Sequence, residues 1–232
     1  MDWIQLFSKS KEIFYTDFLL DFMCTLVIVI YLLRGRKNKA LLYLPILASA
    51  SLIQILISQY DILSHHKSIL GKLANNNAIY FYLIVESTCC LLFLSQSVSS
   101  SLSKKIILAS AIAFIIYAVY YWTLNCTMWK SLPFIQNIEG FLIIVPCLYY
   151  FYELLTHVSD KDLLFDPAFY VIAAMLVLFS AITPLFLFLN YLNKNYKPLA
   201  DKLFMINNIA YILLFLSFLV AIFIDSRNRK SC

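Results

Sequence analysis

The sequence predicts an all-α integral membrane protein, a bundle of seven transmembrane helices with its N-terminus outside and its C-terminus inside. Three observations support this prediction. Hydrophobic residues make up 62% of the 232 residues, and the mean hydropathy is +0.81. Only 13% of the residues are charged, a balance typical of membrane-spanning chains. Seven apolar segments, none of which contains Lys, Arg or His, follow one another along the chain.

Each apolar segment is about long enough to form a transmembrane helix. A hydrocarbon core about 30 Å thick requires about 20 residues of helix at 1.5 Å per residue. In lipid the backbone must satisfy its own hydrogen bonds, so we expect every segment to be helical. The segments are residues 18–33, 41–58, 78–97, 106–122, 133–155, 168–189 and 203–224. Because the connections are short, we interpret residues 1–232 as a single transmembrane domain.

The two ends of the chain are interpreted separately. Residues 1–16 mix aromatic and charged residues near helical spacing, which is typical of a short helix lying in the membrane interface. A frayed tail with a few anchoring aromatic residues is the alternative. The segment lacks the basic start, apolar run and cleavage site of a secretory signal. Residues 225–232 are expected to form a basic cytoplasmic tail.

The basic residues between the segments predict the orientation. With the N-terminus outside, ten of the 18 Lys and Arg residues lie on the inner side and eight on the outer side. The densest group places four cations within residues 34–39, directly after the first segment. We therefore expect a multi-pass protein of the cell's inner (cytoplasmic) membrane, with its basic residues at the anionic inner leaflet. The net charge of +5 then requires no nucleic acid as a partner.

Prolines and small residues refine the expected helices. Asp166 followed by Pro167 predicts the start of the sixth helix, as an N-cap and a proline in the first helical position. Pro45, Pro146 and Pro184 are expected inside the second, fifth and sixth helices, where each frees a carbonyl and favours a kink.

The chain has only three glycines, and the GxxxG packing motif is absent. We therefore expect close helix approach at residues 48–51, which read Ala-Ser-Ala-Ser, and at the Ala109-xxx-Ala113 spacing.

Motifs for catalysis, metals or cofactors are not found. The sequence contains no HExxH and no Gly-x-Ser-x-Gly, and the seventh segment has no lysine to hold retinal. The six cysteines show no CxxC spacing, and the adjacent pair His65-His66 has no third ligand nearby. We expect no enzymatic activity, no cofactor, no metal site and no disulfide.

Acidic residues within the apolar segments are the strongest functional signal. They are Asp21, Glu86, Glu139 and Glu153. Glu86 is the deepest, because eight residues of helix place it about 12 Å from the outer boundary. A carboxylate at such a depth costs about 2.5–3.5 kcal/mol and usually faces the bundle interior. Glu139 lies about two turns into the fifth segment, whereas Asp21 and Glu153 lie nearer to segment ends.

Uncharged polar residues gather in the same outer half of the membrane, while the inner half is mainly apolar. This asymmetry is typical of a cavity that opens to the outside. The predicted ligand-binding set is Asp21, Gln54, Tyr82, Glu86, Asn137, Glu139, Thr183, Asn207 and Asn208. Since no cation lies within the segments, the acids must be protonated, hydrogen-bonded to neighbours such as Tyr82 or Asn207, or partnered by a solute. Hydrogen bonds that only hold the helices together are the alternative.

Several short motifs resemble a known family. They are NNNAIY at residues 75–80, PFI at 133–135, YYFYELL at 149–155, DPAFY at 166–170 and NN at 207–208. Over residues 75–225 the chain resembles an uncharacterised family of small seven-helix membrane proteins from Bacteroidota-type bacteria. Members of such families often stand next to sensor kinases or are fused to them, so the resemblance implies a sensory or partner-binding module. Ala181 departs from the glycine that the resemblance leads us to expect in the sixth helix.

Our leading hypothesis is therefore a sensor or receptor-like module. Its outward-facing polar pocket binds a small solute, for example a cation, or protons, and the bundle signals to a cytoplasmic, kinase-like partner or to another membrane subunit. Three alternatives remain open: an assembly subunit of a larger membrane complex, a proton- or cation-coupled carrier, and a lipid-modifying enzyme. The missing internal repeat and the apolar inner half disfavour the carrier.

Overall fold

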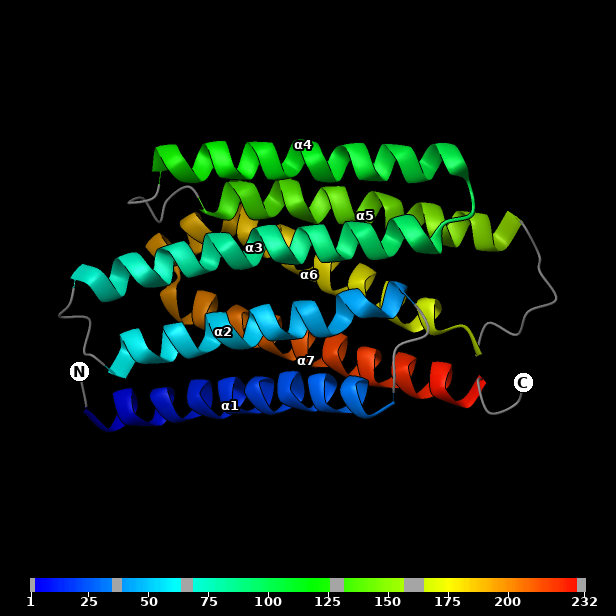
Figure 1. Cartoon of the computed structure of the whole chain (residues 1–232). Helices are drawn as coiled ribbons and strands as arrows, with labels where there is room; N and C mark the ends of the chain where they lie inside the picture. Colours follow the sequence, from blue (N-terminus) through cyan, green and yellow to red (C-terminus); the bar gives the residue numbers. More distant parts are fainter. Residues whose placement is uncertain (1–2, 35–38, 64–68, 126–131, 157–164, 229–232) are drawn as a thin grey trace.

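The computed structural model describes residues 3–34, 39–63, 69–125, 132–156 and 165–228 as seven long helices lying side by side (Figure 1). The helices are α1 (Trp3–Arg34), α2 (Tyr43–Leu63), α3 (Ile69–Ser97), α4 (Ser101–Asn125), α5 (Leu132–Thr156), α6 (Pro167–Asn195) and α7 (Lys197–Asn228). A short 3-10 turn, Ala40–Leu42, leads into α2. His65, His66, Cys126 and Cys232 lie outside the described residues.

Six of the helices are long and apolar enough to cross a membrane, which confirms the predicted all-helical, membrane-type fold for α2 to α7. Their spans are Ala40–Ser58, Asn77–Ser97, Ser101–Thr123, Pro133–Thr156, Pro167–Leu189 and Met205–Asn228. A seventh crossing by α1 stays a prediction. α1 is one unbroken helix of 32 residues, about 48 Å long at 1.5 Å per residue. It therefore exceeds a hydrocarbon core by several turns, and the interfacial placement of residues 1–16 also stays a prediction.

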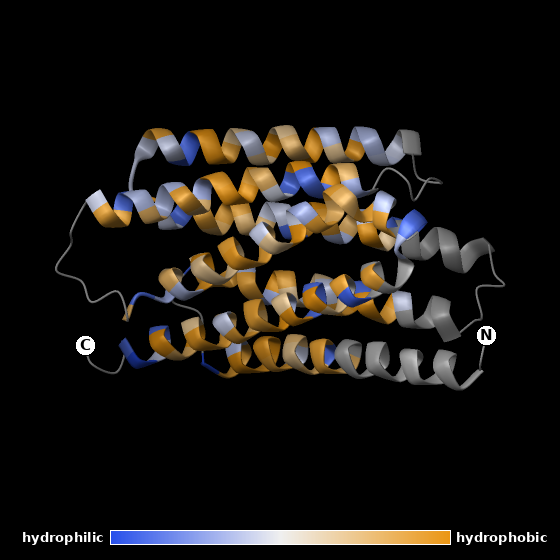
Figure 2. Cartoon of the chain, turned by 180° about the vertical axis from the view of Figure 1, so that it is seen from behind, coloured by the Kyte–Doolittle hydropathy of each residue, from blue (hydrophilic) through white to orange (hydrophobic). Residues whose placement is uncertain are grey.

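Successive helices run in opposite directions along the bundle (Figure 1). We call the end where α1, α3, α5 and α7 begin the N-terminal end of the bundle, and the end where they finish the C-terminal end. In the predicted orientation the N-terminal end faces outside. Figure 2 shows hydrophilic residues within the half that lies toward the N-terminal end and others at the helix ends of the C-terminal end, with mainly hydrophobic residues along the rest of the helices.

The contacts between helices close a ring of six. Around the ring, α1 packs on α2, α2 on α3, α3 on α5, α5 on α6, α6 on α7, and α7 on α1 again. α4 lies outside this ring, mainly against α3. Burial follows the same order, because 61% of the α3 span is buried within the chain but only 22% of the α4 span. α3 is therefore central and α4 is peripheral.

The expected start of α6 is confirmed. The Asp166 carboxylate accepts a hydrogen bond of 2.9 Å from the Ala168 amide, and Pro167 occupies the first turn. Pro146 and Pro184 lie inside α5 and α6 as predicted. Pro45 differs, because α2 begins at Tyr43 and places this proline in the first turn. Amide groups of a first turn have no partner within the helix, so Pro45 removes no helical hydrogen bond.

The small-residue spacing predicted in the fourth helix does not pack against another helix in the described part of the chain. Ala109 and Ala113 of α4 are exposed, and the buried side of α4 carries Ala111 and Ala118 instead. A close crossing joins α5 to α6 at Gly140, where an added Cβ atom would overlap Thr183 Oγ1. The prediction for α4 was wrong because the spacing alone does not say which side of a helix faces the chain.

Candidate functional site

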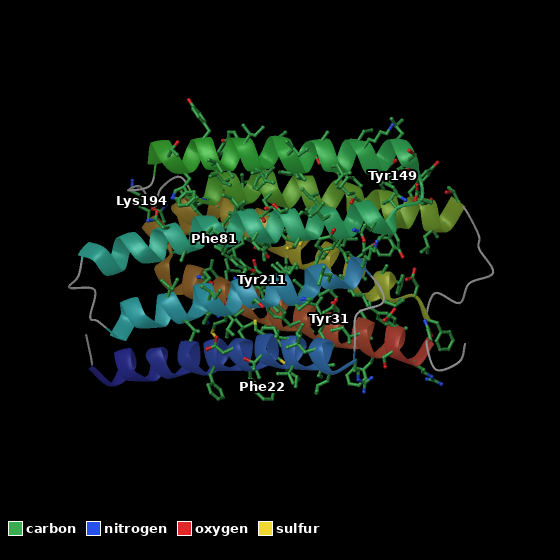
Figure 3. All side chains as sticks on the ribbon, in the orientation of Figure 1. Phe22, Tyr31, Phe81, Tyr149, Lys194 and Tyr211 are labelled. Atoms are coloured by element: carbon green, nitrogen blue, oxygen red, sulfur yellow. The ribbon has the colours of Figure 1, made fainter. Side chains whose placement is uncertain are left out.

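Glu86 of α3 and Tyr211 of α7 meet in the middle of the bundle. The Tyr211 hydroxyl donates a hydrogen bond of 3.3 Å to Glu86 Oε2, and Glu86 is only 3% exposed. The hydroxyl of Tyr82, one turn from Glu86 on α3, lies near this carboxyl group and near the Tyr211 hydroxyl. Figure 3 shows Tyr211 between the helices, in contrast to Phe22, which projects away from the bundle. Because α3 and α7 lie on opposite sides of the ring, this contact crosses its centre.

Glu139 of α5 forms the second half of the site. It is 3% exposed, and one of its carboxyl oxygens is hydrogen-bonded to the hydroxyl of Ser87, the neighbour of Glu86 on α3. The two carboxyl groups lie close enough to interact electrostatically. Three helices, α3, α5 and α7, are thus connected through one buried polar cluster. We call Tyr82, Glu86, Ser87, Glu139 and Tyr211 the central cluster.

The Ser87 hydroxyl has one hydrogen and two partners. It donates to the Leu83 carbonyl over 2.7 Å, and it also contacts Glu139. A carbonyl oxygen can only accept, whereas a carboxyl group accepts when ionised and donates when protonated. When Ser87 donates to Leu83, a protonated Glu139 completes the pair by donating to Ser87. An ionised Glu139 instead draws the hydrogen away from Leu83. The hydrogen-bond pattern at Ser87 is therefore coupled to the charge on Glu139.

Four buried side-chain oxygens near the middle and the N-terminal end have no hydrogen-bond partner among the residues that the structure describes. They are Glu86 Oε1, Gln136 Oε1, Asn137 Oδ1 and Asn207 Oδ1. Buried polar groups are almost always paired, and an unpaired one costs about 1–3 kcal/mol. Four such oxygens in one half of the bundle therefore mark positions for donors that the described residues do not supply.

Helix geometry places two of these oxygens, those of Gln136 and Asn207, between the central cluster and the N-terminal end of the bundle. Gln136 precedes Glu139 by three residues on α5, and Asn207 precedes Tyr211 by four on α7. Residues at these spacings share a helix face. The side-chain amides of Gln136 and Asn207 thus lie about one turn closer to the N-terminal end than the Glu139 carboxyl group and the Tyr211 hydroxyl. Asn137 instead precedes Gly140 by three residues and lies on the side of α5 that approaches α6.

The other predicted site residues lie elsewhere. Gln54 lines a groove of about 300 Å³ between α2, α3 and α4, with Asn77, Phe81 and Trp122 among its neighbours. Thr183 sits at the α5–α6 crossing, and its hydroxyl donates to the Phe179 carbonyl over 2.6 Å. The structure therefore does not bring Gln54 and Thr183 into the central cluster.

Asp21 and Asn208 lie at the edges of the region. Asp21 is half-buried on α1, one turn from Cys24, whose thiol lies near Ser51 of α2. Cys24 also lies near Tyr82, so the face of α1 that carries Asp21 borders the central cluster. Asn208 is half-buried on α7 and points to a different side from its neighbour Asn207.

Glu153, the fourth acid within the apolar segments, has a structural role. Its carboxylate accepts hydrogen bonds from the amide and the hydroxyl of Ser99, both over 2.8 Å, and from the amide of Ser100 over 3.2 Å. These amides immediately precede α4, where free N–H groups and the helix dipole favour a negative charge. Glu153 of α5 therefore caps the start of α4 across the fold.

The C-terminal end of the bundle is fastened by polar contacts between neighbouring helices. Arg34 of α1 donates to the Ser226 hydroxyl of α7 over 2.9 Å and stacks on the Phe223 ring at 3.9 Å. Tyr150 of α5 donates to the Asp166 carboxylate over 3.1 Å. Further bonds join Asn228 to the Phe165 carbonyl and Gln96 to the Tyr43 hydroxyl. This end differs from the N-terminal half, where buried acceptors lack partners.

Tyr211 and Ser87 are the members of the central cluster that sequence reasoning missed. Both are common residue types in transmembrane helices, and their roles depend on helices that are distant in sequence. A signal existed for Tyr211, since it follows Asn207 by one turn on the same face.

Within the described part of the chain, no three His, Cys, Asp or Glu residues are grouped so that they could hold a metal ion. Comparison with protein-family models, curated proteins and solved structures found no match.

Proposed function

We propose that this chain is a membrane sensor module whose central cluster responds to a small solute or to protons. The observation that carries the proposal is the combination of two buried carboxyl groups with four unpaired buried acceptors, in the half of the bundle predicted to face outside. Ionisable residues within membrane spans are costly to keep, and they usually mark ligand or proton sites.

The arrangement of helices supports a route for the signal. A change at the central cluster acts on α3, α5 and α7 together, because hydrogen bonds join all three there. α7 continues to the C-terminal end, where Ser226 and Asn228 hold α1 and the segment before α6. A shift of α7 at Tyr211 therefore reaches the end that we expect to face a cytoplasmic partner.

The core beyond the central cluster supports a sensor over a carrier. Phe93 of α3 and Phe215 and Phe218 of α7 follow the cluster toward the C-terminal end, and none is more than 1% exposed. These side chains fill the bundle where a permeation path would have to continue. A solute that reaches Glu86 from the N-terminal end thus meets a closed apolar layer.

The proposal is tested by measuring motion at the C-terminal end. Spin labels at Leu33 of α1 and Leu155 of α5, both strongly exposed, report the distance between these helices in the purified full chain. We expect the distance distribution to differ between pH 5 and pH 8 in the parent protein. Glu86→Gln and Glu139→Gln should abolish the difference, whereas Asp225→Asn, which makes a similar change far from the cluster, should keep it. A response that survives both Glu variants would contradict the proposal.

A subunit role in a larger membrane complex is the second candidate. α4 lies outside the ring, and its exposed side presents Ala109 and Ala113, a spacing that favours close packing of transmembrane helices. This reading predicts that a second membrane protein co-purifies with the chain and is lost in Ala109→Leu/Ala113→Leu. It also predicts that Glu86→Gln leaves the complex intact.

A further inference from the structure

The unpaired atoms at the central cluster define the chemistry of what can bind there. Glu86 Oε1, Gln136 Oε1 and Asn207 Oδ1 are all oxygens, and an unpaired oxygen of this kind is satisfied by an N–H or O–H donor or by a cation. An anion would add further acceptors to a site that already holds two carboxyl groups. The site therefore selects against anions.

These oxygens lie in order along the bundle. Glu86 and Glu139 lie at the centre of the ring, and Gln136 and Asn207 lie one helical turn nearer to the N-terminal end on α5 and α7. A species that enters from this end meets the amide oxygens first and the carboxyl groups last. Both carboxyl groups are 97% buried, so a bound cation loses most of its water and needs these oxygens as replacements.

The composition of the ligand set favours a single positive charge. Zinc prefers Cys and His ligands, and calcium takes six to eight oxygens, several of them carboxylates. The described residues contain no cluster of three such groups. Two carboxyl groups supplemented by neutral amide and hydroxyl oxygens suit a monovalent cation, with one carboxyl group ionised and the other protonated.

We propose that the central cluster binds one small monovalent cation, an alkali metal ion or a primary ammonium group, between Glu86 and Glu139 in exchange for a proton. This inference rests on the proposed function and names its ligand class. Binding ionises one carboxyl group, the proton leaves to solution, and the net charge of the site is unchanged. Gln136 and Asn207 supply oxygens nearer to the N-terminal end.

Proton exchange has to be assigned among the titratable groups in and around the site. On α3 these are Tyr82, Glu86, Cys89 and Cys90, on α5 Glu139 and Cys147, and on α7 Tyr211. On α1 they are Cys24 beside Tyr82 and, one turn away at the edge of the cluster, Asp21. Near neutral pH, phenol and thiol groups in an apolar interior keep their protons. Glu86 and Glu139, the carboxyl groups within the cluster, are therefore the groups that exchange a proton with the cation.

The test uses the full chain in lipid nanodiscs and isothermal titration calorimetry. Sodium chloride and methylammonium chloride are the probes for the two sources of cation, and N-methylglucamine chloride is the bulky-cation control at equal ionic strength. We expect saturable binding of at least one small cation and none of N-methylglucamine. Affinity should weaken about tenfold per pH unit on acidification where one proton is displaced, and repeats in buffers of different ionisation enthalpy should report one proton released.

Variants test whether cation binding depends on the central cluster or only on the overall charge of the protein. Glu86→Gln should abolish binding, and Asn207→Leu should weaken it at least tenfold, whereas Asp225→Asn should bind as the parent does. If Glu86→Gln fails to fold, Glu139→Gln and Gln136→Leu provide the same test, with circular dichroism confirming the fold of each variant. Equal heats for sodium and N-methylglucamine, or binding without proton release, would overturn the inference.

The outcomes also distinguish this inference from the proposed function. Cation binding without any change in the Leu33–Leu155 distance would sustain the cation site and contradict the sensor. A pH-dependent distance change without cation binding would sustain a proton sensor and overturn the cation site.

Discussion

Gly140 shows how one residue fixes the position of a functional side chain. It lies next to Glu139 on α5 and faces Thr183 of α6, where an added Cβ atom would overlap the Thr183 hydroxyl and lie 3.2 Å from its Cβ. The absence of a side chain lets the two helices approach, and the approach directs the adjacent Glu139 toward α3.

Gly140→Ala is expected to destabilise the protein by about 1–3 kcal/mol, because the added methyl group overpacks the crossing. The free energy of unfolding in mixed detergent micelles measures the effect. Thr183→Ala removes the hydroxyl but leaves a Cβ at close range, so the double variant should recover part of the loss. If the stability losses of the two single variants simply add in the double variant, the contact between Gly140 and Thr183 is contradicted, because substitutions at neighbouring residues are expected to couple.

At the same scale, the sequence indicated the acids but not their partners. Glu86 and Glu139 stood out because a carboxyl group is rare and costly in an apolar segment. Ser87 and Tyr211 did not stand out, because hydroxyl groups are common there and their partners come from other helices. Glu153 resembled the other acids in sequence, and only the amides of Ser99 and Ser100 show its capping role.

At the scale of elements, the cap at the start of α4 is the contact whose loss has the clearest outcome. We expect Glu153→Gln to lower the free energy of unfolding by about 1–3 kcal/mol, because its amide group turns a donor toward the backbone donors before α4. Ser99→Ala removes the hydroxyl but keeps the hydrogen bond from the backbone amide to Glu153. The loss of unfolding free energy should therefore be smaller, about 0.5–1.5 kcal/mol.

Thermal unfolding of both variants in detergent provides the measurement, with Ser110→Ala as a control within α4. A Glu153→Gln variant as stable as the parent would show that solvent replaces the cap. Cation binding at the central cluster should be unaffected by either change.

Helices were predictable as elements because hydropathy reports their apolar centres. Their ends were not, because α3 begins at Ile69 and α7 at Lys197, well before the apolar residues start. The extra turns are polar, and a hydropathy criterion excludes them although the backbone stays helical. The capped start of α6 was an exception, because Asp166 and Pro167 specify it locally.

The orientation of the whole molecule is a prediction that two native cysteines test. Cys126 follows α4 and Cys232 follows α7 in sequence, so an odd number of membrane crossings separates them. With the N-terminus outside, a membrane-impermeant maleimide should label Cys126 in intact cells and Cys232 only after lysis. The buried residues Cys24, Cys89 and Cys147 should stay unlabelled in the folded protein.

Cys126→Ser and Cys232→Ser assign each label to one residue. An epitope at the N-terminus should be accessible under the same conditions as Cys126 if α1 crosses the membrane. The reverse labelling pattern would invert the orientation, and an epitope on the opposite side would show that α1 does not cross.

At this scale the sequence predicted the asymmetry between the two halves of the bundle but not the ring. Hydropathy gives no information on which helices are neighbours. The packing of α3 directly on α5, with α4 left outside, depends on surface complementarity over several turns. Gln54 and Thr183 were assigned to the same pocket, whereas Gln54 lines a groove between α2, α3 and α4 and Thr183 lies at the crossing of α5 and α6.

The peripheral position of α4 has a consequence for the order in which the helices assemble during synthesis. Glu86 is made 125 residues before Tyr211, its partner across the ring. At 5–20 residues per second, this separation amounts to roughly 6–25 s of synthesis. Until α5 and α7 arrive, the nascent chain exposes a carboxyl group on α3 to lipid, to the translocon or to a membrane chaperone. α4 is the next helix to emerge, and it packs against the already inserted α3 without occupying the place that α5 later takes.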